Sequence, residues 1–169
     1  MILRCSEEES GLNYLSKRIK TAFGIIAEGK VSQSASEARS LGFLRSTDQI
    51  SINGDSLVSD SIKTILNMID QGYNIPSPII SIPVLGSPAL SNLKLEMHQM
   101  LRGNYISKYD LFLGTKLGYV LCGGDCQSLQ NVSEEYLLDL ERECFLGLCG
   151  EIKSQERIKF MLKKGKPLR

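Results

Sequence analysis

Long apolar runs, a strong net charge and an export signal are all absent from this sequence. No run of about 18 apolar residues occurs, so the sequence predicts no transmembrane helix. The formal net charge is only +1, which gives no electrostatic reason to expect binding to nucleic acid or to an anionic membrane. The N-terminus becomes acidic at Glu7–Glu9 before the apolar core of a signal peptide develops, and we therefore expect a cytoplasmic protein.

Motifs that bind phosphates or carry nucleophiles are also missing. The sequence contains no G-x-G-x-x-G, no G-x-x-x-x-G-K-[ST] and no G-x-S-x-G, and Gly118 and Gly123 lie too far apart to form a phosphate loop. His98 is the only histidine, and no carboxylate partner lies near it in sequence. Because it falls at the flank of an apolar helical stripe, we interpret it as a surface residue and not as a general base.

The cysteines are odd in number and poorly spaced for metal binding. They are Cys5, Cys122, Cys126, Cys144 and Cys149. In a cytoplasmic protein we expect them to be reduced. Neither of the two close pairs has the C-x-x-C spacing of structural zinc or redox sites, so packing is the favoured role, and a cysteine-based metal or redox protein remains a third hypothesis.

One acidic cluster lies in an apolar setting, at Glu141 and Glu143. These residues belong to an acidic segment, 133–149, which is followed by a basic one, 151–169. We expect two neighbouring helices of complementary charge, in which Glu141 or Glu143 pairs with Arg157 or Lys159, in preference to acid–base catalysis or a nucleic-acid-binding tail. The sequence therefore predicts no catalytic, cofactor-binding or metal-binding residue in this chain.

Helix signals, in contrast, are abundant, and they predict a mainly α fold of about seven helices with one or two short strands. Serine caps and capping boxes occur at Ser6–Glu9, Ser34–Glu37, Ser87, Ser107–Asp110, Ser133 and Ser154. Apolar residues follow each start at spacings of three and four. The third stripe is Val58, Ile62, Ile65, Leu66 and Ile69, and the last, expected to face inward, is Ile158, Met161 and Leu162. Alternation predicts a short strand at Gln49–Ile52.

Three of the five prolines fall between residues 72 and 86. Proline is poorly tolerated in a central strand, so this segment predicts an extended connector that holds at most a short edge strand. We therefore expect three parts: residues 1–75, a proline-rich connector at 76–86, and a helical C-terminal domain at 87–169.

Several strings resemble a known enzyme family over about residues 12–169. They are Gly29–Leu44 (GKVSQSASEARSLGFL), 103–110 (GNYISKYD), 117–124 (LGYVLCGG), 132–145 (VSEEYLLDLERECF), 155–158 (QERI) and 165–169 (GKPLR). The first resembles the late part of a crotonase-type enoyl-CoA hydratase domain. Together they are similar to the C-terminal part of bacterial bifunctional 3-hydroxyacyl-CoA dehydrogenase/enoyl-CoA hydratases of fatty-acid β-oxidation.

The resemblance implies a chain without the residues that perform the chemistry. It implies that residues 1–75 are the closing helices of a crotonase-like domain. It also implies that NAD and acyl-CoA bind upstream domains, with no cofactor held in this chain. One position departs from the family pattern, since Tyr109 stands where the family's S-x-H-D string has histidine, which argues against a ligand or proton-relay role there.

Two functional hypotheses of different classes follow. In the first, the chain is the C-terminal segment of such an enzyme, whose partners are the crotonase and dehydrogenase domains and, through them, acyl-CoA; nucleic acid and membrane are not expected partners. In the second, it is an independent helical interaction module derived from an enzyme tail. The apolar surfaces of that module would be the helix with Ala35 and Ala38 and the connector segment Ile79–Val84.

Overall fold

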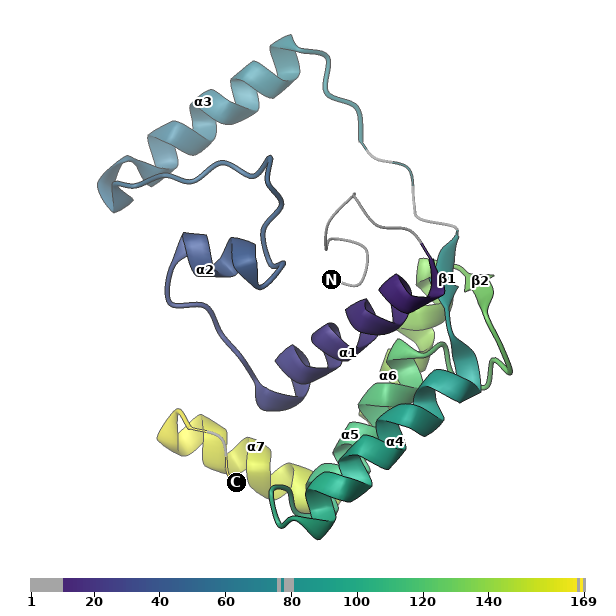
Figure 1. The fold of residues 1–169 in the computed structure, drawn as a ribbon. Coiled ribbons are helices and arrows are strands. Elements are labelled where there is room, and N and C mark those ends of the chain that lie inside the picture. The colour runs from purple at the N-terminus through teal and green to yellow at the C-terminus, as the bar shows by residue number, and fades with distance from the viewer. Residues whose placement is uncertain (1–10, 76, 78–80, 167, 169) are drawn as a thin grey trace. The chain divides into compact units, whose positions relative to one another are not determined.

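The computed structural model describes residues 11–75, 77, 81–166 and 168, so the capping box expected at Ser6–Glu9 lies outside the described residues. Figure 1 shows a mainly α architecture, as predicted. The seven α-helices of the described part are α1 (Leu12–Glu28), α2 (Ala35–Ser40), α3 (Leu57–Asp70), α4 (Gly86–Arg102), α5 (Lys108–Leu121), α6 (Glu134–Cys149) and α7 (Ile152–Lys164). A 3-10 turn, Gly54–Ser56, precedes α3, and two short strands, β1 (Ile82–Val84) and β2 (Gln130–Val132), complete the fold. None of these helices is long and apolar enough to cross a membrane.

The chain divides into two compact units. The small unit comprises the described residues of Val31–Pro78, with α2 and α3. The large unit comprises those of Ser6–Lys30 and Ile79–Arg169. This division differs from the predicted boundary, because α1 packs on α5 and so belongs with the C-terminal helices. The assignment of residues 1–75 to a crotonase-like domain stays a prediction.

The core of the large unit forms where α1, α4 and α5 meet. Its buried side chains are Leu15, Ile19, Leu90, Leu93 and Cys122. The helices approach closely because α5 presents glycine at its most buried positions: a Cβ on Gly118 would lie 3.3 Å from Cδ1 of Leu90. The spacing of Leu113, Leu117 and Leu121 predicts that they face inward on α5, but they are only partly buried beside these glycines.

An ion pair between Lys20 and Glu96 joins α1 to α4 at the surface of the large unit. The spacing of Leu12, Leu15, Ile19, Phe23 and Ile26 predicts the buried stripe of α1, and the observed stripe is rotated slightly from it. Leu15 and Ile19 are buried as expected, whereas Leu12 and Ile26 are exposed and Ala22 and Ile25 take their places. Because neighbouring helix positions differ by about 100°, a small rotation is enough to exchange them.

One strand prediction is wrong and the other is confirmed. Gln49–Ile52 has no strand structure, and Ile52 is almost fully exposed. The proline-rich connector does hold a short edge strand, β1, which pairs antiparallel with β2, with Pro83 opposite Asn131. A sheet of two strands has only edge strands, so the missing N–H of Pro83 is tolerated there.

Three of the predicted serine caps form. The hydroxyl oxygens of Ser34, Ser107 and Ser133 each accept a hydrogen bond from the backbone N–H three residues later. Ser87 is not a cap, because α4 already begins at Gly86 and Leu85 precedes it. Ser154 is an exception, because α7 already begins at Ile152 and Ser154 is buried within its first turns. The prediction that Ile158, Met161 and Leu162 face inward is also wrong, since all three are exposed. The described contacts of α7 with α5 are made instead from its N-terminal half, through Ser154 and Arg157.

Candidate functional site: a pocket between three helices

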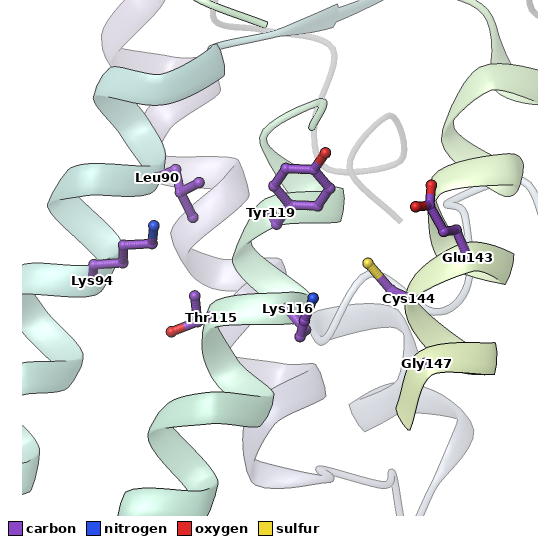
Figure 2. Close-up of a pocket in the computed structure, with 8 residues that line it drawn as sticks. All are labelled: Leu90, Lys94, Thr115, Lys116, Tyr119, Glu143, Cys144 and Gly147. Atoms are coloured by element: carbon purple, nitrogen blue, oxygen red, sulfur yellow. The ribbon is translucent and has the colours of Figure 1, made fainter. Parts of the chain in front are cut away.

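A pocket of roughly 430 Å³ opens between α4, α5 and α6 in the large unit (Figure 2). Its apolar part is formed by Leu90 from α4 and by the ring of Tyr119 from α5. The other lining residues are Lys94, Thr115, Lys116, Glu143, Cys144 and Gly147. Figure 2 shows Lys94 on one side of the pocket and Glu143 and Cys144 on the other, with Tyr119 and Lys116 between them.

Of the acidic pair singled out in the sequence, Glu143 lines this pocket, whereas Glu141 is not among the lining residues. The predicted ion pair is wrong. Arg157 instead binds Asp110 at the start of α5, with 2.7 Å between Nη1 and Oδ1. Neither glutamate forms an ion pair within the described part of the chain. The reason is tertiary, because α7 directs Arg157 toward the N-terminus of α5 and away from α6.

The thiol and the phenol of the pocket are held in their neutral forms. Burial raises the pKa of the Cys144 thiol; Glu143 raises it further, and Lys116 opposes the shift. Burial, together with a hydrogen bond to Asp125, raises the pKa of Tyr119 to about 12. A protonated thiol is a weak nucleophile, so these groups suit packing and hydrogen bonding better than covalent catalysis.

The cysteines near the end of α5 pack inside the large unit. Cys122 is fully buried, and burial raises the pKa of its thiol to about 11. Cys126 is also buried, and its sulfur accepts a hydrogen bond from Nε2 of Gln130 at 2.6 Å. The described cysteines are all free thiols. No group of three or more potential metal ligands occurs in the part of the chain that the structure describes.

Tyr109 packs between α5 and α7 and makes only structural contacts in the described residues. Its hydroxyl lies 2.8 Å from Oγ of Ser154, and its ring stacks on Phe112. The guanidinium of Arg157 and the ammonium of Lys153 lie 5.2 Å and 5.5 Å from the ring centroid, within cation–π range. The residue that replaces the expected histidine therefore joins α5 to α7.

The other residues considered in the sequence have no common site. His98 is exposed on α4 and does not line the pocket. Gly118 contacts α4, whereas Gly123 lies against β1, so the two serve packing in different places. Sequence reasoning missed Lys94 and Lys116, which lie on different helices 22 residues apart in number (116 − 94). No local pattern marks such a pair.

The dinucleotide NAD does not fit the described residues. Its pyrophosphate is typically held by a glycine-rich turn between a parallel strand and a helix. The strands of the described residues form one antiparallel pair, and the sequence lacks the glycine fingerprint. No step that uses NAD is therefore assigned to residues of this chain.

Comparison with known proteins gives one informative relative. No family model matches the chain, and no solved structure matches it. A protein of Bacillus subtilis (strain 168) named "Probable 3-hydroxyacyl-CoA dehydrogenase" is 43% identical to it over 159 residues. The match covers 94% of this chain but only 20% of the relative. The chain is related to one segment of that protein. It spans about one fifth of the length of the curated relative that it matches.

Proposed function

We propose that this chain is the counterpart of the C-terminal segment of a fatty-acid β-oxidation enzyme with 3-hydroxyacyl-CoA dehydrogenase and enoyl-CoA hydratase domains. Its role is to pack on the domains that perform the chemistry and to stabilise them. The single observation that carries the proposal is the 43% identity over nearly the whole chain to a segment of a probable 3-hydroxyacyl-CoA dehydrogenase. The hydratase assignment rests on the crotonase-like strings in the sequence.

The chemistry of the pocket supports a structural role. Catalysis of either reaction needs a general base or acid placed beside the substrate. The pocket has a thiol and a phenol whose pKa values are raised, and histidine is not among its lining residues. Its other ionisable side chains, Lys94, Lys116 and Glu143, form no ion pair with one another, so the pocket contains no paired acid and base. In this proposal NAD and acyl-CoA bind other domains of the enzyme, which functions in the cytoplasm.

An independent interaction module is less well supported. Ala38 is buried, and so are Ile82 and Val84 of the connector, so these residues are already covered and are unsuited to contact a partner. The remaining connector residues of that hypothesis, Ile79 and Ile80, lie outside the described residues. No observation on the described surfaces favours this second function over the first.

A chimeric enzyme tests the proposal. In the B. subtilis relative, the segment matched by this chain is replaced with this chain, and two rates are measured: NAD-dependent oxidation of a 3-hydroxyacyl-CoA and hydration of crotonyl-CoA. We expect the chimera to oxidise the hydroxyacyl-CoA at a rate within about tenfold of the unmodified relative, and the same protein with the segment deleted to lose that activity. The isolated chain should catalyse neither reaction.

Hydration is the finer part of this test, because the relative's name concerns only the dehydrogenase. A chimera that oxidises but does not hydrate, alongside an unmodified relative that does both, would contradict the crotonase assignment. Turnover of either substrate by the isolated chain would contradict the proposed lack of an active site.

A further inference from the structure

The apolar side of α3 is not covered by the described residues of its own unit. The helix contains no buried residue at all. The apolar side chains along one side of the helix are between half and three quarters exposed: Val58, Ile62, Ile65, Leu66 and Ile69. Single exposed leucines are common on protein surfaces, but a helix face made of such residues marks an interaction surface. We call these five residues the α3 apolar face.

The contacts that α3 makes within its own unit use its other side. Oγ of Ser51 donates a hydrogen bond to Oδ2 of Asp60 at 2.6 Å. Oγ1 of Thr64 lies 2.8 Å from Oε1 of Gln49. Asp60 and Thr64 are four positions apart and therefore lie on one face of the helix. The segment before α3 is thus held against the polar face, which leaves the apolar one free.

The small unit has almost no core of its own. Of the thirteen buried apolar side chains in the described residues, only Ala38 belongs to it. A unit of this size needs to bury apolar surface to offset the entropy of ordering its chain. The residues that accompany Ala38, among them Leu41 and Phe43, are only partly buried. Its largest apolar surface is therefore directed away from its own centre.

We propose that the α3 apolar face is the docking surface by which the small unit binds the remainder of a dehydrogenase-type enzyme. This inference rests on the proposed function and adds the surface and its occupant. In the B. subtilis relative the matched segment is accompanied by about four fifths of the protein's length, which is four times the segment itself. That remainder supplies the apolar surface that α3 lacks.

The chemistry of the face defines what its occupant must offer. None of its five residues is charged, whereas Asp60 and Lys63 lie on the opposite side. An occupant that pairs with it is therefore an apolar groove or sheet face without buried charge, since an unpaired charge placed there is costly to desolvate. The side-chain spacing of three and four fits the insertion of one helix face into such a groove.

Cysteine labelling in the chimera described above tests this docking directly. Ile62→Cys places a thiol on the α3 apolar face, and the matched control Lys63→Cys places one on the polar face of the same turn. Both positions are exposed in this structure. Maleimide labelling is followed by peptide mass spectrometry, which separates the introduced thiols from the native ones. In the isolated chain, we expect both thiols to be labelled at similar rates.

In the chimera we expect Ile62→Cys to be labelled at least about tenfold more slowly than in the isolated chain, while Lys63→Cys keeps its rate. Equal rates at both positions in a chimera that oxidises hydroxyacyl-CoA would overturn the docking surface and leave the proposed function intact. An inactive chimera contradicts the proposed function, whereas the labelling rates report docking separately. In the isolated chain, concentration-dependent protection of Ile62→Cys would mean that a second copy is the occupant. Concentration-independent protection would mean that the chain's own residues cover the face, and either result overturns the proposal.

A charged substitution gives a second measurement. Leu66→Glu introduces a carboxylate on the α3 apolar face, and Asn67→Glu introduces the same group at the next position, on the polar side. We expect Leu66→Glu to restore fast labelling of Ile62→Cys in the chimera and Asn67→Glu to leave it slow. Both variants should keep the helix content of the isolated chain, measured by circular dichroism. Equal behaviour of the two glutamates in the chimera would contradict the proposal.

Discussion

The two units of this chain differ in how far they bury their apolar residues. The large unit places Ile19, Leu93 and Cys122 in a core made by three helices that approach through glycine. The small unit also contains a helix with a continuous apolar face, α3, yet that face stays exposed. The difference shows that helix formation and core formation are separate. Local sequence signals make α3 a helix, but its apolar face is buried only when a partner packs against it.

The largest expected effect contrasts one leucine from each unit. Leu93→Ala leaves a cavity in the core of the large unit, because Leu93 is only 3% exposed, and should lower the free energy of unfolding by about 2–5 kcal/mol. Leu66→Ala, on the exposed face of α3, should change it by about 0.5 kcal/mol or less in the isolated chain. Denaturation in urea, followed by circular dichroism, measures both. Similar losses for the two variants would mean that the small unit has a core comparable to that of the large one.

An intermediate effect is expected at Gly123, where α5 ends against β1. Its φ is +91°, and a Cβ there would lie 2.5 Å from Cγ2 of Val84. Gly123→Ala should therefore destabilise the large unit by roughly 1–3 kcal/mol, through backbone strain and overlap. Gly147→Ala in α6 is the control, because a Cβ there meets nothing within 4 Å, and it should stabilise the helix by up to about 1 kcal/mol. Thermal unfolding compares the two variants. An unchanged Tm in Gly123→Ala would show that β1 shifts readily to accommodate the added Cβ.

The smallest expected effect depends on pH and concerns Asp110, which joins the start of α5 to α7. Burial raises the pKa of this carboxyl, but hydrogen bonds from the side chain and backbone of Ser107 and the nearby Arg157 outweigh burial and hold the pKa below its ordinary value of 3.8. Ionised Asp110 therefore stabilises the fold above that ordinary value, and the stabilisation is lost as the pH falls through the lowered pKa.

Asp110→Asn should accordingly lower the Tm by the same amount at every pH above about 5, and this difference should shrink below about pH 4. Thermal unfolding of the two proteins across this range measures it. A difference that persists unchanged at pH 2–3 would show that the loss comes from packing and not from the charge of Asp110.

The sequence predicts features set by neighbouring residues well. The serine caps at Ser34, Ser107 and Ser133 depend on hydrogen bonds within one turn, and the structure contains them. The same holds for the helix end at Gly29, which a glycine directly after an apolar helical stripe predicts. The mainly α class follows from the same signals. These features could be predicted because each is decided within a few residues of the chain.

Features decided by distant residues could not be predicted. β2 is a polar segment whose strand structure depends on pairing with β1 about 48 residues earlier (130 − 82). The partner of Arg157 is Asp110 and not Glu141 or Glu143, because the direction of α7 decides it. The pocket combines Lys94, Lys116 and Glu143 from three helices. Such groupings carry no local signature, and they follow only from helix packing.

Hydrogen exchange of α3 and α5 tests the central claim most directly, because it compares the two units in one sample. In the isolated chain we expect the amides of α3 to exchange at least about a hundredfold faster than those of α5, since α3 lacks buried contacts. When this chain replaces its counterpart in the B. subtilis relative, protection of α3 should rise by at least about tenfold, while that of α5 changes little. Protection of α3 equal to that of α5 in the isolated chain would contradict the account that the small unit depends on the rest of an enzyme.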